Sequence, residues 1–435
     1  MSFKNPIIHL FIIIAILFTV TSNFHWGKDN WKGVLESDAK GYYAYLPALF
    51  IYHDPNFKFV DNIEQSDFIF PHLRYDFRAN SYGKSLNKYY AGTSICQLPF
   101  FVIAHGITML TENPENGYSV WYMRMITLAS IFYCSVGLYF FILLSWRFNV
   151  SSSVTSFILY AIVFGTHLFV YTVVEPGMSH VYSFGLISMF IYFTHEYMIQ
   201  KRPKLSLYAL AALLSIIVLI RPLNIVILLF VPFLAGSIPR LMTFFRKLLL
   251  RPKQLILSII IFTFGLFIQA LWYKLATGHW WVYSYGNEGF NFYYPHFMDI
   301  LFSYKKGLFL YTPMLLFGFL TTFFLWARNE RFRFLSWMLF FIVITYLFSS
   351  WHSWYYGGSF SSRVYVEYIA VFMLPLGLYL SRLNMKPKRK LALILVVLLI
   401  GICQLQSYQY RYYDIHFSEM NKERYWEVFL MRNRY

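Results

Sequence analysis

Two carboxylates stand among aromatic residues just after the first apolar segment of the chain. Glu36 and Asp38 lie in the stretch 31–47, which also carries three tyrosines. Acidic groups beside a bilayer are costly and are usually functional. Because a carboxylate at a membrane surface can take a proton from a hydroxyl group, these two acids are the first candidates for chemistry.

Further polar groups fall on the side of the membrane where we expect the two acids. They are Lys88 in segment 87–93, Glu175 and His180 in segment 175–180, Arg221 before Pro222, and Trp351, His352, Trp354 and Arg363 in segment 351–363. Three of these groups precede predicted membrane helices, whose starts offer unpaired N–H groups and a positive dipole end that favour anions. Together with Lys88, they predict a phosphate site at the outer membrane surface.

Structural roles are open alternatives for the single residues. Arg221 or Arg363 taken alone is as readily an interfacial anchor that reaches toward lipid headgroups as it is a phosphate ligand. Trp351 and Trp354 taken singly are typical of an aromatic belt. Glu175 and His180 are as readily a structural pair, bonded to each other, as they are functional residues. The convergence of acids and bases on one face favours a functional site.

Composition defines the broad class of the protein. The 435 residues are 58% hydrophobic, 22% aromatic and only 13% charged, which is more apolar side chain than a water-soluble core can hide. We therefore expect an all-α polytopic integral membrane protein. The net charge of +17 resides in short clusters between apolar runs, where it meets anionic lipid headgroups rather than nucleic acid. The three cysteines lack metal-ligand spacing and are expected in the core.

Eleven apolar segments are each near the length that crosses a bilayer. They are roughly 6–20, 119–146, 152–174, 179–198, 205–220, 222–238, 255–275, 308–327, 334–350, 364–381 and 391–407. The first is expected to be retained, because the sequence after it lacks a small-x-small cleavage site. The stretch 205–238 is counted as two crossings, since about 50 Å of single helix would overshoot the hydrocarbon core.

The basic loops predict the orientation. Segments 201–204, 240–253, 328–333 and 382–390 should face the cytoplasm. The apolar run 91–110 breaks this alternation if it crosses, so we interpret it as an interfacial or re-entrant helix. Residues 24–118 are then one large outer-side region with interfacial helices. The predicted organisation is a transmembrane domain over 1–407 and a short outer-side tail over 408–435, with no separate soluble domain.

The chain resembles the GT-C superfamily of polytopic glycosyltransferases. The resemblance is carried by Glu36-Ser-Asp38 in the first outer loop, by Asn87-Lys-Tyr-Tyr-Ala-Gly-Thr, and by Gly358-Ser-Phe-Ser-Ser-Arg363 before a late span. The nearest types are bacterial protein-mannosyltransferases and aminoarabinose transferases. Tyr90 and Ala91 replace the prolines expected after Lys88, and a Ser replaces the Gly expected before Arg363. The resemblance implies a sugar donor on polyprenyl phosphate, an active site on the periplasmic face of the inner membrane, and an acidic base.

A lipid-phosphate leaving group needs charge stabilisation more than protonation, so one carboxylate suffices as base. We assign Asp38 as the base, with Glu36 orienting the acceptor or a divalent cation. Lys88, Arg221 and Arg363 would hold the phosphate. The remaining substrate-pocket candidates are Glu175, His180, Trp351, His352 and Trp354.

Several points stay open at the level of the sequence. Glu-x-Asp alone is too weak a ligand set to demand a metal ion. The acceptor is a lipid, a glycan or a protein. A transporter or flippase of lipid-linked sugars would use the same basic residues but would leave Asp38 without a chemical task. An O-antigen ligase or polymerase would use a diphosphate-linked donor.

Overall fold

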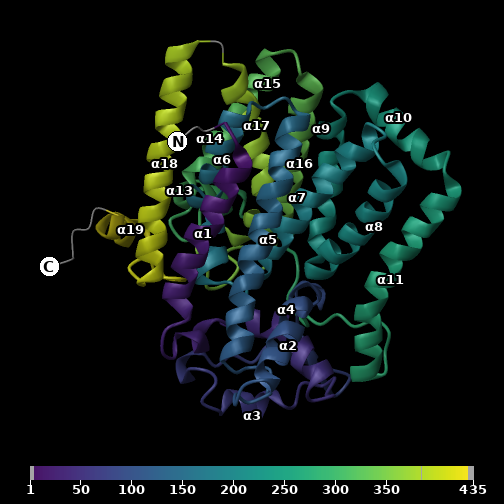
Figure 1. The fold of residues 1–435 in the computed structure, drawn as a ribbon, viewed down its shortest axis with the longest axis vertical. Helices are drawn as coiled ribbons and strands as arrows, with labels where there is room; N and C mark the ends of the chain where they lie inside the picture. The colour runs from purple at the N-terminus through teal and green to yellow at the C-terminus, as the bar shows by residue number, and fades with distance from the viewer. Residues whose placement is uncertain (1–3, 384, 430–435) are drawn as a thin grey trace.

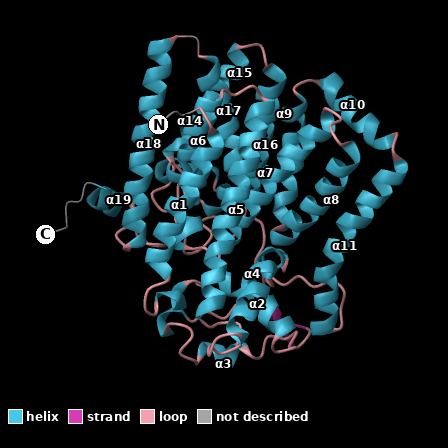
Figure 2. Cartoon of the chain, viewed as in Figure 1, coloured by secondary structure: helices cyan, strands magenta, loops and turns pink. Residues whose placement is uncertain are grey.

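The computed structural model describes residues 4–383 and 385–429, and it is a bundle of helices with two short strands in that part of the chain (Figure 2). Seven predicted crossings are single helices. They are α1 Pro6–His25, α5 Val120–Arg147, α7 Ser179–Met198, α8 Pro203–Ile220, α11 Pro252–Thr277, α16 Arg331–Ser349 and α18 Lys386–Arg411. Their lengths match what a bilayer requires.

Four other predicted crossings are broken into shorter pieces. They are α6 Ser152–Phe164 with η3 Val170–Val174, η4 Pro222–Phe230 with α9 Val231–Ala235, α13 Leu308–Tyr311 with α14 Pro313–Thr321 and α15 Phe323–Ala327, and η5 Arg363–Tyr368 with α17 Ile369–Arg382. Pro313 and Pro222 stand at first helical positions, where the missing N–H costs nothing. All eleven predicted segments are thus helical, and the all-α polytopic fold class is confirmed.

The region 24–118 gathers at one end of the bundle, the lower end in Figure 1. It holds η1 Asn30–Gly33, α2 Asp38–Phe50, α3 Val60–Glu64, η2 Pro71–Leu73, β1 Arg78–Ser81, β2 Lys84–Asn87 and α4 Gly92–Met109. The antiparallel hairpin of β1 and β2 is a small departure from the all-helical expectation. Its turn residues Tyr82 and Gly83 both have positive φ, which suits a tight two-residue hairpin.

Helix α4 is the apolar run that we predicted to be interfacial or re-entrant. By length and composition it is one of eight helices that could cross a membrane. However, Tyr133 and Tyr122, both in the first half of α5, contact Cys96 and His105 of α4. The loop after α4 returns to α2, where the Tyr43 hydroxyl donates to the Gly117 carbonyl. The start of α4, where the Ser94 hydroxyl donates to the Tyr42 carbonyl, and the loop after α4 therefore both lie beside α2. The position of α4 relative to the bilayer stays a prediction.

The basic loops come together at the opposite end of the bundle, near α10 Ile238–Leu249 and α15 (Figure 1). There Glu330 pairs with both Arg333 and Arg382, which ties α16 to the end of α17. Arg147 of α5 pairs with Glu196 of α7, with 2.6 Å between nitrogen and oxygen. This separation of the basic loops from α2 is the arrangement that the charge pattern predicted.

The C-terminal boundary differs from the predicted one. Helix α18 continues past residue 407 to Arg411, so its last turn belongs to the helix rather than to a tail. The short helix α19 Lys422–Phe429 then packs back on the bundle, where Tyr425 contacts the rings of Tyr304 and Tyr311. The longer α18 matters for the site, because it carries Tyr410 to Glu175.

Candidate functional site

Asp38 is the first residue of α2, at the end of the bundle where region 24–118 gathers. The N-terminus of a helix carries a partial positive charge, which stabilises a carboxylate in its first turn. The preceding residue, Ser37, has φ of 46°, a left-handed conformation that costs free energy for a residue with a side chain. Buried tyrosines of α2 fix the helix from behind, among them Tyr43 and Tyr45.

The carboxylate of Asp38 has two strong partners. Its Oδ2 lies 2.6 Å from Nη2 of Arg363, and its Oδ1 accepts a hydrogen bond of 2.6 Å from the hydroxyl of Tyr89. Tyr89 is hydrogen-bonded in turn to Tyr75, at 2.8 Å. Burial acts to raise the pKa of Asp38, but Arg363, the Tyr89 hydrogen bond and Arg221 outweigh burial and hold the pKa below its usual value. Asp38 is therefore ionised at neutral pH and able to accept a proton.

Lys88 follows directly after the hairpin, which fixes its backbone through a hydrogen bond of 3.1 Å from its N–H to the Phe77 carbonyl. The Lys88 ammonium pairs with Glu288 and lies 5.3 Å from the ring centroid of Tyr285. Gly92 then brings the chain against α8, because a Cβ there would lie 2.2 Å from the backbone nitrogen of Ile220. This close approach places the segment that carries Lys88 beside the end of α8.

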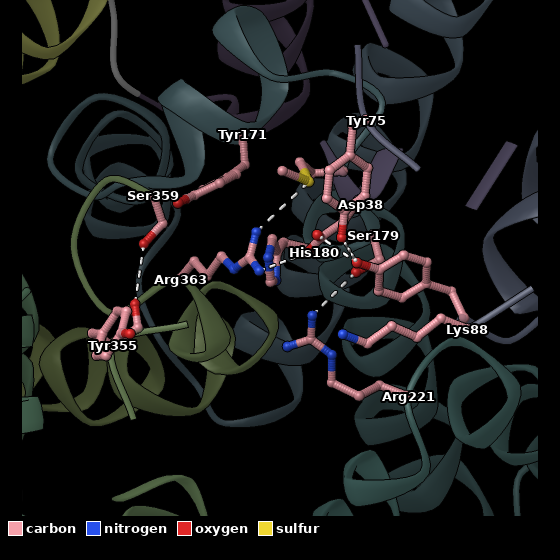
Figure 3. A network of polar contacts seen from close by, with 12 residues as sticks. Asp38, Tyr75, Lys88, Tyr171, Ser179, His180, Arg221, Tyr355, Ser359 and Arg363 are labelled. Atoms are coloured by element: carbon pink, nitrogen blue, oxygen red, sulfur yellow. Dashed lines mark hydrogen bonds and ion pairs between the residues drawn. The ribbon is translucent and has the colours of Figure 1, made fainter. Parts of the chain in front are cut away.

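Arg221 lies at the junction between α8 and η4. Its Nη1 is 3.2 Å from Oε1 of Glu367, a side chain with no exposed surface, and its Nη2 is 3.4 Å from the Ser179 hydroxyl oxygen. The same Glu367 oxygen is 3.2 Å from Nδ1 of His180. The buried Glu367 thus orients Arg221, while the guanidinium also reaches the space in front of Asp38 (Figure 3).

Asp38, Lys88, Arg221 and Arg363 converge on one cavity of about 380 Å³, which we call the Asp38 cavity. Its other lining residues are mostly aromatic: Tyr42, Tyr75, Tyr89, Tyr90, Pro222, Leu223, Tyr283, Tyr285, Glu288, Phe290, Trp351, His352, Ser353, Tyr356 and Gly357. Three cations and two carboxylates line it, so the cavity has a formal charge of +1. An apolar wall with a few converging charges is typical of a small-molecule site.

A second cavity, of about 540 Å³, is lined in part by Glu36 and Ser37, and we call it the Glu36 cavity. Glu36, Glu175, Tyr75 and Met178 are among its lining residues. Burial, together with the negative charge of Glu175, raises the pKa of Glu36 to about 7. Burial likewise raises the pKa of Glu175, although the Tyr410 hydroxyl donates to it.

The structure groups most of the predicted site residues, but in two cavities rather than one. Asp38, Lys88, Arg221, Arg363, Trp351 and His352 line the Asp38 cavity, whereas Glu36 and Glu175 line the Glu36 cavity. Glu36 and Asp38 therefore do not offer a divalent cation a common site. No group of three or more His, Cys, Asp or Glu side chains in the described residues is arranged to hold a metal ion.

The structure places two of the predicted substrate-pocket residues outside both cavities. His180 has no exposed surface and turns into the bundle toward Glu367, so it supports Arg221 from behind instead of lining either cavity. Trp354 stacks on His296, with ring centroids 5.4 Å apart, and also lies outside both cavities. The structural alternative of a Glu175–His180 pair is wrong, because Glu175 accepts a hydrogen bond from Tyr410 and His180 faces Glu367.

Sequence reasoning missed several residues of the site. Tyr75, Glu288 and Glu367 lie outside every motif quoted above. Tyr89 lies inside segment 87–93, beside Lys88, but had no role assigned to it. Lys306 was also missed. Its ammonium is buried and donates to the carbonyls of Ser359 and Phe417, and burial lowers its pKa to about 7. The one available signal was that Glu367 is an acid inside an otherwise apolar segment, which usually implies a partner.

The fold is similar to that of a protein of known structure. Comparison of the sequence with protein-family profiles and with curated proteins finds no match. Among solved structures, ArnT from Cupriavidus metallidurans, whose structure was determined bound to undecaprenyl phosphate, matches with a TM-score of 0.54 and 14% sequence identity. The match covers 92% of this chain and 64% of that one. The chain therefore shares the polytopic helical fold of ArnT, as the sequence motifs predicted, and at this identity the likeness concerns the fold alone.

Proposed function

We propose that the protein is a membrane glycosyltransferase that moves a sugar from a polyprenyl-phosphate donor to an acceptor hydroxyl. The observation that carries this proposal is the convergence of an ionised carboxylate with three cations in one aromatic-lined cavity. The fold that the chain shares with ArnT, which was crystallised with undecaprenyl phosphate, supports a lipid-phosphate donor. The proposed site faces the periplasm of a bacterial inner membrane.

The basic residues act on the leaving group, and Asp38 acts on the nucleophile. Arg221, Lys88 and Arg363 stabilise the phosphate as the bond to the sugar breaks, since hydrogen bonds from charged donors to an anion are strong. Asp38 accepts the proton of the attacking hydroxyl. Arg363 holds Asp38 before the donor arrives, and the incoming phosphate competes with Asp38 for this guanidinium.

A transfer assay tests the proposal. Purified protein in lipid nanodiscs receives a radiolabelled polyprenyl-phosphate sugar, and lipid mass spectrometry compares cells with and without the protein. We expect label to move from the donor and the donor lipid to accumulate in cells that lack the protein. Binding of polyprenyl phosphate without any transfer, and transport of the labelled lipid across the bilayer, would instead favour the flippase alternative.

A further inference from the structure

The Glu36 cavity is the larger of the two cavities, and the proposed binding of the donor does not use it. Among the described residues, Tyr75 alone lines both the Glu36 cavity and the Asp38 cavity. Ser37, next to Asp38, and Met178, whose sulfur is 3.9 Å from Nη1 of Arg363, also line the Glu36 cavity. The Glu36 cavity thus comes close to the Asp38–Arg363 pair and adjoins the Asp38 cavity at Tyr75.

The Glu36 cavity is rich in hydrogen-bond acceptors that lack donors. Oε1 of Glu175 accepts a bond of 2.6 Å from Tyr410, but its Oε2 is buried and has no partner among the described residues. Neither carboxyl oxygen of Glu36 accepts a hydrogen bond from those residues. An unpaired polar group in a buried place is costly, so the cavity is suited to a ligand that brings several donors.

Aromatic rings make up much of the remaining wall. The rings are those of Phe24, Phe70, Tyr75, Tyr410, Tyr413 and Phe417. Flat apolar faces combined with carboxyl acceptors are complementary to a sugar, which has apolar C–H faces and hydroxyl donors at its edges.

The charges of the cavity do not favour a strongly anionic ligand. The lining residues that can carry a positive charge are His25, His72, Arg74 and Arg411. Arg74 is exposed, and the Arg411 guanidinium lies over the ring of Phe24, 5.2 Å from its centroid. Glu36 and Glu175 are each more buried than Arg74, and the negative charge of Glu175 adds to burial in raising the pKa of Glu36. A hydroxyl-rich ligand that carries no phosphate of its own in the cavity fits this arrangement.

We infer that the Glu36 cavity binds the acceptor, that this acceptor is a hydroxyl-rich sugar group, and that Glu36 and Glu175 hold it while one hydroxyl passes Tyr75 to Asp38. This inference rests on the proposed function. The acceptor oxygen attacks the anomeric carbon of the donor sugar, and a new C–O bond forms. The bond from that carbon to the phosphate oxygen breaks, polyprenyl phosphate leaves with the electron pair, and Asp38 takes the hydroxyl proton.

The sugar group can belong to a water-soluble glycan or to a glycolipid. Phe24 and His25 at the end of α1, and Tyr410 and Arg411 at the end of α18, form part of the wall, so the cavity lies at the ends of two helices that cross the membrane. The experiment therefore uses two acceptor probes: the glycolipid fraction and the water-soluble glycan fraction of the producing cells.

Filling the cavity provides the test. A Cβ at Gly33 meets Glu36, Leu73 and Phe70 at ordinary contact distances of 3.6 to 3.9 Å, so Gly33→Leu projects into the Glu36 cavity. Gly27→Leu is the matched control, because a Cβ at Gly27 has nothing within 4 Å and does not line the cavity. Glu175→Gln is a second variant that changes hydrogen bonding with little change in volume.

We expect Gly33→Leu to raise the KM for the acceptor at least tenfold, Glu175→Gln to raise it severalfold, and Gly27→Leu to leave it unchanged. Binding of polyprenyl phosphate should be normal in all three, which also reports that they are folded. Unchanged acceptor KM in both Gly33→Leu and Glu175→Gln, with transfer intact, overturns the inference and leaves the proposed function standing. If the unsubstituted protein transfers the sugar from the donor but to neither fraction, this inference is overturned and the proposed function stands. If it transfers no sugar from the donor to any acceptor, the proposed function fails and this inference fails with it.

Discussion

Replacing Asp38 by asparagine should lower the rate of sugar transfer but raise the affinity for the donor. Asparagine has nearly the size of aspartate but cannot accept the acceptor proton at ordinary pH, and loss of a general base typically costs about 10²- to 10⁴-fold in rate. We therefore expect turnover by Asp38→Asn to fall by at least about 100-fold.

Donor binding should become tighter in the same variant. Arg363 is engaged by Asp38 at 2.6 Å, and both side chains are largely buried, with 9% and 14% of their surfaces exposed. A hydrogen bond between charged groups is worth roughly 1.5 to 3 kcal/mol, and a phosphate that takes Arg363 from Asp38 gives up that amount. Removing the competing carboxylate also raises the formal charge of the cavity from +1 to +2. We expect polyprenyl phosphate to bind about ten- to 100-fold more tightly.

The assay measures Kd for polyprenyl phosphate and single-turnover transfer with variants matched for folded protein in nanodiscs. Asp54→Asn is a suitable control, since Asp54 caps a surface turn by accepting from the backbone N–H groups of Asn56 and Lys58 and lies outside both cavities. Weaker donor binding by Asp38→Asn would refute the competition between carboxylate and phosphate. Turnover at the unsubstituted rate would refute the role of Asp38 as base.

Three further predictions concern the charges around the two cavities. Arg221→Ala should weaken polyprenyl phosphate binding by roughly ten- to 100-fold. Arg221→Lys should weaken it less, because lysine supplies the charge without the planar guanidinium. Equal Kd values for the unsubstituted protein and both variants would remove Arg221 from the site. Glu288→Gln frees the partly exposed Lys88, so donor binding should tighten by up to about fivefold at low salt and less at high salt, and weaker binding would contradict this reasoning. The pKa of Glu36 lies at about 7 in the folded protein against a usual 4.5, so the folded state holds this proton more tightly than the unfolded state. The contribution of Glu36 to stability is therefore present below about pH 4.5 and is lost as the pH rises through 7. Tm should fall over this range, and the fall should be smaller in Glu36→Gln. An identical dependence of Tm on pH in Glu36→Gln and the unsubstituted protein would refute the raised pKa.

The sequence by itself determined the class of the protein and most of its helices. The length and hydrophobicity of a segment are local properties of the sequence. Each of the eleven helical segments could therefore be predicted without knowing which segments pack against it. The positive charges of the loops likewise predicted which loops lie at the same end of the bundle, without any information on how the helices pack. Short motifs also identified Asp38, Lys88, Arg221 and Arg363, because isolated charges in an apolar chain are few and conspicuous.

Tertiary structure alone decided how these charges are paired and on which side of Asp38 each one lies. Arg363 is 325 positions from Asp38 along the chain, and Glu288 is 200 positions from Lys88, so no local pattern predicts either contact. The separation of Glu36 from Asp38 has a local cause that only the backbone reveals: Ser37 adopts a positive φ, and the two acids point into different cavities. Pairing depends on which helices pack together, and packing is decided by the shapes of buried side chains over the whole bundle.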